Sequence, residues 1–254
     1  MSAVSVQVDQ QVATITLDSP KTRNALNPKT SQELVGICDD IDHNSDIGAV
    51  VVRGANSTFC SGAERDVLDR AGEDPASAQH FADIGSVYEA FVRVGNLAVP
   101  SVAAVRGAAV GAGVNLLLAT DLRIVAHNAR IIAGFSTIGL HPGGGHFTLL
   151  DRLGGRELAA AVGIFGAELS GQRAFELGIA WAAVEDEAVD ERAVDIARTA
   201  AKDPELSRRT VLTMRQELGP PGVSWPVALE MERGPQMWSL SRRWKRRTGN
   251  TGSG

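Results

Sequence analysis

The chain has 254 residues, 44% hydrophobic and 22% charged, a composition that is typical of a folded globular protein and excludes a disordered or fibrous chain. Its formal net charge of −5 argues against a nucleic-acid-binding protein, which would need a basic stripe to contact the phosphates. No apolar run approaches the roughly 18 residues that indicate a membrane span.

The first part of the chain predicts a hairpin followed by a helix. Residues 4–8 and 12–17 alternate apolar and polar side chains around a short polar turn. Asn27 and Pro28 then supply a helix cap and a first-turn proline. The apolar residues that follow at helical spacing are Leu34, Ile37, Cys38 and Ile41.

Three later segments, 49–52, 101–105 and 122–126, are apolar and rich in β-branched or small residues, which predicts buried strands. Helical segments lie between them, so we expect crossover connections and layered α/β packing. From about residue 143 onward the pattern is mostly helical.

The C-terminal part contains two more helix signals. Asp203-Pro204 predicts a capped helix start, and residues 219–222 form a break before a last helix. That helix needs cover from the protein's own core or from a neighbouring subunit, because of its large apolar side chains, Trp225, Leu229, Met231, Met237, Trp238 and Trp244. The basic run 242–247 is interpreted as a solvated helix end or, alternatively, as a contact for an anionic ligand or a subunit.

Cofactor motifs are missing from the sequence. The glycines of 107–113 have the spacing GxxxGxG, which fits neither GxGxxG nor a P-loop. Five histidines without paired cysteines give no metal-site spacing, so we expect no metal. Two cysteines and no signal-peptide pattern predict a cytoplasmic protein.

Two glycine turns have a different chemical use. Residues 59–64 and 111–113 each follow a predicted strand and precede a helical segment. Free backbone N–H groups at a helix N-terminus can hold a developing oxyanion. Two such turns could supply two donors to one oxygen.

Five motifs in one order then resemble the enoyl-CoA hydratase/isomerase (crotonase) superfamily. The resemblance covers roughly residues 4 to 200, and its motifs are SPKTRNALN at 19–27, FCSGAE at 59–64, PSVAAVRG at 100–107, VGAGVNLLLATDLRIVA at 110–126 and SGQRAFELG at 170–178.

The resemblance implies an α/β fold of the ClpP/crotonase type. It predicts a spiral of ββα units with an acyl-CoA site over 1–200 and a C-terminal helical trimerisation region over 201–247. The tail over 248–254, TGNTGSG, is expected to be disordered from its own sequence. It also implies a homotrimer or a dimer of trimers. Coenzyme A is expected as part of the substrate, in fatty-acid or other acyl-CoA metabolism, and not as a tightly bound cofactor.

The resemblance also assigns site residues. The backbone N–H groups of Ala63 and Ala112 are expected to form the oxyanion hole for the thioester oxygen. The path of the coenzyme A moiety is expected to run along Lys21, Arg23, Ala25, Leu26, Ser61, Gly62 and Ala63.

Both catalytic glutamates of a hydratase in this family map onto other residues. Asn115 takes the place of the first, and Phe135 takes the place of the second. An amide can orient a water molecule but cannot transfer a proton near neutral pH, so ordinary two-glutamate hydration is not expected. Phe135 is interpreted either as an aromatic pocket wall or as core packing.

Other residues could supply the proton transfer. His146 and His141 flank a glycine loop that closes over the acyl part of the pocket in the family, and histidine has a suitable intrinsic pKa. Glu64 and Asp66 are alternatives. Relatives that isomerise dienes or displace aryl halides carry an aspartate at the place of Gly143, so Gly143 speaks against those reactions.

Three functions therefore remain open. The first is an enzyme, an isomerase or lyase in the broad sense, that stabilises an acyl-CoA enolate. The second is a module that binds acyl-CoA without catalysis. The third is hydrolysis by Ser61 or Ser136 with a loop histidine, which spacing alone does not establish.

Overall fold

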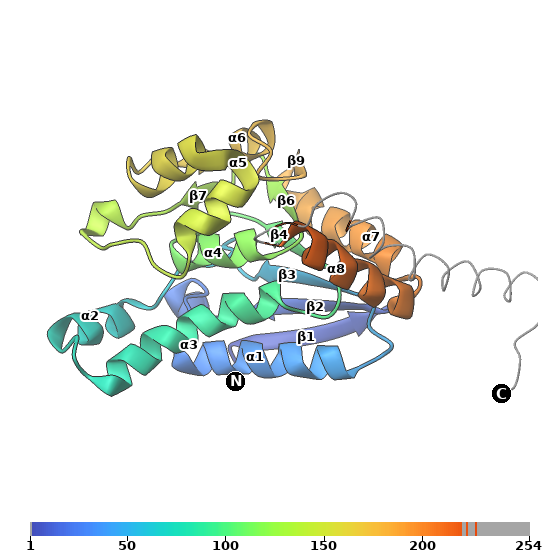
Figure 1. Ribbon diagram of the computed structural model, residues 1–254, viewed down its shortest axis with the longest axis horizontal. Helices are drawn as coiled ribbons and strands as arrows, with labels where there is room; N and C mark the ends of the chain where they lie inside the picture. The colour runs from blue at the N-terminus through green and yellow to red at the C-terminus, as the bar shows by residue number, and fades with distance from the viewer. Residues whose placement is uncertain (1, 220–221, 223–226, 228–254) are drawn as a thin grey trace, which may run out of the picture.

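The computed structural model describes residues 2–219, 222 and 227, and it is a mixed α/β structure with two sheets (Figure 1). Its strands are β1 (Val4–Asp9), β2 (Val12–Leu17), β3 (Ala49–Gly54), β4 (Ser101–Val105), β5 (Ala108–Val110), β6 (Leu122–Ala126), β7 (Arg130–Ile132), β8 (Leu169–Ser170) and β9 (Ala182–Val184).

The larger sheet has the strand order β1-β2-β3-β4-β6-β9. All neighbouring pairs are parallel except the antiparallel β1–β2 hairpin, so the predicted hairpin and crossovers are confirmed. The hairpin turn places Gln10 and Gln11 at positive φ, 47° and 67°, as a two-residue turn that matches the strand twist requires. Residues 49–52 of β3 are all buried, which means that both faces of the strand are covered.

The smaller sheet, in the order β5-β7-β8, was not predicted from the sequence, and neither was β9. Each of these strands has only two or three residues, too few to show a periodic pattern. Isolated bridges join Cys60 to Ala109 and Leu26 to Ala63. The first bridge places the turn at 59–64 next to β5, and the second joins that turn to the segment 19–27.

The α-helices connect and cover the sheets. They are α1 (Pro28–His43), α2 (Arg65–Glu73), α3 (Ala78–Gly95), α4 (Ala112–Ala119), α5 (His146–Gly163), α6 (Gly171–Glu176), α7 (Val189–Ala201) and α8 (Pro204–Leu218). The predicted cap of α1 is present, since the Asn27 side chain accepts a hydrogen bond from the Thr30 N–H. Helix α1 packs along α3, and α7 packs against β2, β3, β4 and β6 (Figure 1).

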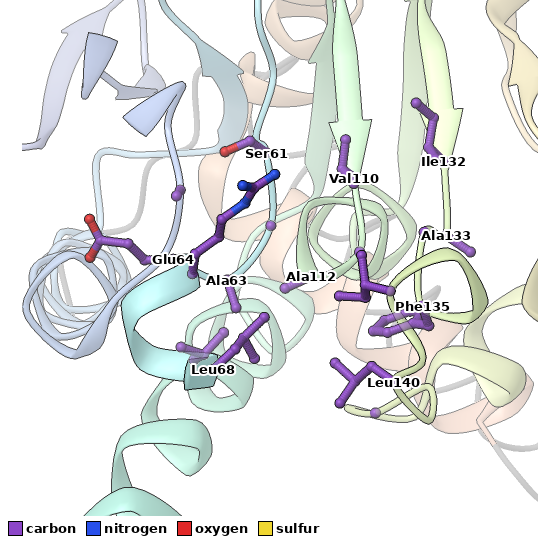
Figure 2. Close-up of a pocket in the computed structure, with 18 of the residues that line it drawn as sticks. Ser61, Ala63, Glu64, Leu68, Val110, Ala112, Ile132, Ala133, Phe135 and Leu140 are labelled. Carbon is purple, nitrogen blue, oxygen red and sulfur yellow. The ribbon is translucent and has the colours of Figure 1, made fainter. Parts of the chain in front are cut away.

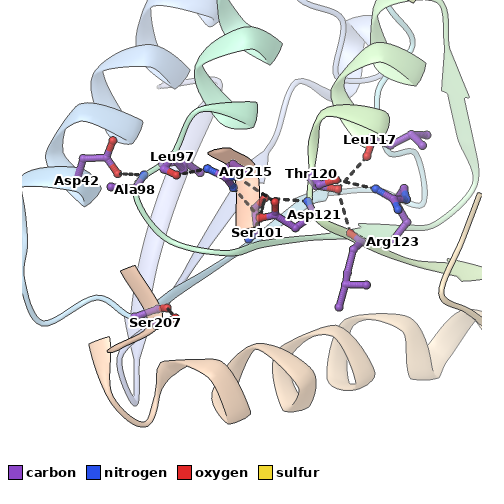
Figure 3. Close-up of polar contacts among 12 residues, drawn as sticks. Asp42, Leu97, Ala98, Ser101, Leu117, Thr120, Asp121, Arg123, Ser207 and Arg215 are labelled. Atoms are coloured by element: carbon purple, nitrogen blue, oxygen red, sulfur yellow. Dashed lines mark hydrogen bonds and ion pairs between the residues drawn. The ribbon is translucent and has the colours of Figure 1, made fainter. Parts of the chain in front are cut away.

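Helix α8 is joined to the segments beside the sheet by partly buried polar contacts (Figure 3). The Arg215 guanidinium donates to the carboxylate of Asp121 at 2.6 and 3.1 Å and to the carbonyl of Leu97. Asp121 also accepts from the backbone and hydroxyl of Ser101, at the start of β4. One carboxylate therefore joins α8 to the segment that leads out of the buried helix α4.

The C-terminal predictions are tested only in part. Asp203 caps α8 as predicted, with its side chain accepting from the Leu206 N–H. The predicted last helix with its tryptophans, the basic run 242–247 and the tail 248–254 lie outside the described residues, apart from Gly222 and Val227. Within the described part, no helix is both long and apolar enough to cross a bilayer.

Candidate active site

A cavity of about 940 Å³ is lined by segments that are far apart in the sequence. They are 21–25, 58–65, the facing sides of α2 and α3, 108–115 and 132–143, with Glu168 added from the loop before β8. Figure 2 shows Ala63 and Ala112 on one side of this cavity and Phe135 and Leu140 on another. The two glycine turns and the glycine loop therefore border one space.

The turn at 59–64 is held against β5. The Val110 N–H donates to the carbonyl of Cys60 at 2.9 Å, and the Leu26 N–H donates to the carbonyl of Gly62 at 2.7 Å. Gly62 has a φ of +96°, and a Cβ there would lie only 2.7 Å from the Val110 oxygen. Only glycine fits this close approach without strain.

The turn before α4 packs equally closely against the turn at 59–64. A Cβ on Gly113 would lie 2.2 Å from the carbonyl oxygen of Cys60, so glycine is required there by space. Gly111, at φ +53°, turns the chain from β5 into the helix. The first residue of α4 is therefore Ala112, whose N–H has no intrahelical acceptor.

The N–H groups of Ala63 and Ala112 are both free at the cavity. Within residues 2–219, neither group donates a hydrogen bond. The place of a Cβ on Gly62, the neighbour of Ala63, lies 3.5 Å from the Ala112 nitrogen. Both alanines line the cavity (Figure 2), as expected from the sequence.

Asn115 lies one turn further along α4 and is only 1% exposed, although it lines the cavity. Its Nδ2 donates to the carbonyl of Gly143 at 3.0 Å. A carbonyl oxygen only accepts, which fixes the orientation of the amide. The other side-chain atom, Oδ1, must therefore accept from His146 Nδ1, which lies 2.7 Å away.

His146 is the first residue of α5 and is 1% exposed. With its proton on Nδ1, the ring keeps a lone pair on Nε2, which has no hydrogen-bond partner among the described residues. Burial lowers the pKa of His146 to about 4, because a buried imidazole loses the hydration of its charged form. The Phe135 ring meets it edge to face, with centroids 5.0 Å apart.

His141 has different surroundings. His141 is exposed and lines the cavity, whereas His146 is buried and does not line it. Its Nδ1 lies 2.7 Å from the carbonyl oxygen of Pro142, so this nitrogen carries the proton in the neutral ring. The lone pair of the neutral ring is then on Nε2.

The other predicted acids are bound elsewhere. The carboxylate of Glu64 accepts from the Asn27 side chain at 2.9 Å and points away from the cavity in Figure 2. Asp66 pairs with Arg70 at the protein surface, 2.8 Å apart. Glu168, which was not predicted from the sequence, lines the cavity and pairs with Arg130 at 2.9 Å.

Most of the expected coenzyme A path borders the cavity. Lys21, Arg23, Ala25, Ser61 and Gly62 all line it, and the Ser61 hydroxyl donates to the carbonyl of Thr22 at 2.7 Å. The exception is Leu26, whose side chain is fully buried in the core.

One buried side chain that was not predicted supports this segment. Asn24 is 2% exposed and donates to the carbonyls of Ala55 and Thr58 at 3.0 and 2.7 Å. Its side-chain oxygen accepts from the Ser19 N–H at 2.8 Å. This amide fixes the RNAL segment at the entrance of the turn at 59–64.

The walls from α2 and α3 were also missed by the sequence analysis. These walls contain Leu68, Ile84, Val87 and Tyr88, and Arg65 borders the cavity beside them. Apolar spacing on amphipathic helices signals only a buried face, so it could not distinguish a cavity wall from a core contact. From the opposite side, Phe135, Ile138 and Leu140 line the cavity, which supports the wall interpretation of Phe135.

Comparisons with known proteins give one consistent family. The family model described as enoyl-CoA hydratase/isomerase matches residues 7–218. The probable enoyl-CoA hydratase EchA14 of Mycobacterium tuberculosis is 35% identical over 241 residues, covering 93% of this chain and 92% of that protein. The 1,2-epoxyphenylacetyl-CoA isomerase of Escherichia coli is 32% identical over 209 residues, covering 80% of this chain and 78% of that protein.

The fold has solved counterparts. A putative enoyl-CoA hydratase from Thermobifida fusca, solved in complex with acetoacetyl-CoA, superposes with a TM-score of 0.81 at 27% identity. The match covers 95% of this chain and 96% of that one. The expected crotonase-type α/β fold is thereby confirmed.

Proposed function

The chain belongs to the enoyl-CoA hydratase/isomerase family, and from that premise we propose that it binds an acyl-CoA thioester in the cavity and stabilises the enolate of its acyl group. It would act in fatty-acid or other acyl-CoA metabolism in the cytoplasm. Coenzyme A enters as part of the substrate.

The observation that carries this proposal is the pair of free N–H groups at Ala63 and Ala112. A thioester oxygen between them gains negative charge as the α-proton leaves. Fixed donors bind that charge more tightly than the neutral carbonyl, so they lower the barrier and not only the dissociation constant. The dipole of α4 adds to this effect at Ala112.

We assign the proton transfer to His141. It lines the cavity, is exposed, and has its lone pair on Nε2. His146 is less suited, because it does not line the cavity and its Nδ1–H is used by Asn115. Its proposed role is to hold the Asn115 amide in place.

Hydration by two carboxylates does not fit these residues. Among the described residues that line the cavity, the only carboxylates are Glu64 and Glu168. The first is bound to Asn27 and the second to Arg130. The proposed chemistry is therefore enolate formation followed by isomerisation, exchange or bond cleavage.

Deuterium exchange tests the enolate step directly. The purified protein is incubated with butanoyl-CoA in D₂O, and the mass of the thioester is followed. Enolate formation incorporates deuterium at the α-carbon without any net reaction. A panel of enoyl-, hydroxyacyl- and β-ketoacyl-CoAs, analysed by mass spectrometry, then identifies the reaction.

The second candidate is an acyl-CoA-binding module without catalysis. The specific observation that favours it is the engagement of both cavity carboxylates by other residues. This function gives submillimolar binding of acyl-CoA but neither deuterium exchange nor turnover. Exchange well above the uncatalysed rate would eliminate it, and absence of any thioester binding would eliminate both functions.

We also propose that the protein assembles as a homotrimer or a dimer of trimers. Large apolar side chains on the C-terminal half are exposed, among them Phe165 at 82% and Trp181 at 63%. Large apolar side chains in water are candidates for contacts with another subunit, because such a contact would remove them from solvent. Light scattering after size-exclusion chromatography should give about three or six times the 26.8 kDa of one chain, and a monomeric mass would contradict the assembly.

A further inference from the structure

The space beside Gly143 is filled by the hydroxyl of Tyr88. A Cβ on Gly143 would lie 2.2 Å from the Tyr88 oxygen, which is far inside contact distance. The two residues come from different segments, Tyr88 from the middle of α3 and Gly143 from the glycine loop. The absence of a side chain at 143 is therefore what leaves room for the phenol.

The Tyr88 hydroxyl is an isolated polar group in an apolar wall. Tyr88 lines the cavity and is 38% exposed, and its ring packs against Phe91 with centroids 5.9 Å apart. Ile84, one turn earlier on α3, lines the same cavity. Within residues 2–219 the hydroxyl has no hydrogen-bond partner.

A short chain of contacts connects this hydroxyl with the thioester end of the cavity. Gly143, which the Tyr88 oxygen contacts, accepts a hydrogen bond from Asn115. Asn115 is three residues after Ala112 on α4, so it lies one turn from the proposed oxyanion donor. The phenol therefore lies near the place of the acyl carbons that follow the thioester carbonyl.

We propose that Tyr88 is a specificity-determining residue that donates a hydrogen bond to an oxygen substituent on the acyl chain of the bound thioester. The inference rests on the proposed acyl-CoA function and deepens it by naming the residue that would select acyl chains with a hydroxyl or carbonyl group near the β-carbon. A few placed polar groups in an apolar pocket commonly fix ligand orientation in this way. A saturated acyl chain offers no acceptor to the phenol.

The first test compares two ligands on the full chain. Isothermal titration measures the dissociation constants of 3-hydroxybutanoyl-CoA and butanoyl-CoA for the wild type and for Tyr88→Phe. The wild type should prefer the hydroxylated ligand about tenfold, the size expected for one net hydrogen bond in a pocket. Tyr88→Phe should lose most of this preference.

Ile84→Val is the matched control on the same helix face. It removes one methyl group from the cavity wall and no polar group, so it should change the affinities for both ligands alike and keep their ratio. An unfolding curve for each variant shows that the fold is intact. Equal ratios in the wild type and in Tyr88→Phe would overturn the inference.

A second readout does not depend on a variant, because Tyr88 is the single tyrosine of the chain. Protein labelled with 3-fluorotyrosine gives one ¹⁹F resonance, which is assigned without further work. Saturating 3-hydroxybutanoyl-CoA should shift this resonance further than butanoyl-CoA at equal occupancy. Equal shifts would reject the hydrogen bond.

The outcomes also separate the inference from the function on which it rests. Binding of both ligands without discrimination leaves the acyl-CoA site standing and rejects only the role of Tyr88. Binding of neither ligand rejects the acyl-CoA site itself, and the role of Tyr88 with it.

Discussion

The imidazole of His146 donates from Nδ1 to the side-chain oxygen of Asn115 across 2.7 Å, and both residues are 1% exposed. The Asn115 amide donates in turn to the carbonyl of Gly143, at the cavity edge. A buried histidine is thus connected through one amide to the glycine loop. Asn115, onto which the resemblance maps a catalytic glutamate of the family's hydratases, connects α4 with the glycine loop and the histidine.

The contribution of this pair to stability can be measured by a double-mutant cycle. Asn115→Leu and His146→Leu each leave a buried polar partner without its hydrogen bond, which costs about 1 to 3 kcal/mol. The double variant removes both partners, so its loss should be smaller than the sum of the two single losses. Urea unfolding of all four proteins gives the coupling energy, and a coupling of zero would show that the contact contributes nothing.

The stability of the protein should depend on pH through His146. Burial holds its pKa at about 4, below the ordinary value of 6.5, so between these values the unfolded chain binds more protons than the folded one. The stabilisation is complete above pH 6.5 and is lost as the pH falls toward 4, by about 3 kcal/mol at most. Unfolding free energies of wild type and His146→Leu across this range should converge at low pH, and parallel curves would contradict the assignment.

The backbone donor at Ala112 can be removed with proline. Proline is tolerated at the first position of a helix, and Ala112→Pro deletes the N–H group while keeping a helical φ. We expect the rate of α-proton exchange to fall about 10²- to 10³-fold, as for the loss of one oxyanion donor elsewhere.

Ala78→Pro is the matched control for that variant. Ala78 is the first residue of α3 and does not line the cavity. This variant should keep both its thermal midpoint and its exchange rate. Unchanged exchange in Ala112→Pro would exclude Ala112 as a donor.

His141 is expected to be the proton-transfer group. His141→Gln retains a polar side chain but no group that can accept and return a proton, so exchange and turnover should fall about 10²- to 10⁴-fold. Acyl-CoA affinity should change little, because His141 is assigned to the proton transfer alone. If His146→Leu and not His141→Gln abolishes turnover in folded protein, the two roles are reversed.

The approach of the two glycine turns can be tested by adding one methyl group. A Cβ on Gly113 would lie 2.2 Å from the Cys60 carbonyl, so Gly113→Ala should push the turns apart and weaken acyl-CoA binding. Gly36→Ala is the control, since Gly36 lies exposed in α1 with open space around it. That variant should gain about 0.5 to 1 kcal/mol from helix propensity, as measured by thermal unfolding.

Local patterns in the sequence predicted much of the fold because they act over a few residues. The hairpin, the caps at Asn27 and Asp203 and the buried run 49–52 each depend on neighbours in the chain. The smaller sheet was not predicted, since its strands are too short for periodicity and are specified by partners distant in sequence.

The candidate site, like the fold, could be predicted from the sequence only in part. The sequence by itself was enough to indicate the family, which the comparisons confirm, and to predict the two glycine turns as N–H donors. That Asn115 and Phe135 stand where hydratases of the family carry acids stays a prediction from the resemblance. It treated His141 and His146 as nearly equivalent, because both flank one loop.

Only the tertiary structure separates the surroundings of those two histidines, on which our proposal for His141 rests, and brings Tyr88 to the glycine loop. Asn115 and His146 are 31 residues apart, and their contact requires α4 and α5 to be packed together. Burial then lowers the pKa of one histidine, while the other stays exposed at the cavity. Desolvation and hydrogen-bond partners depend on packing between distant segments, and for that physical reason no short stretch of sequence could distinguish the surroundings of the two side chains.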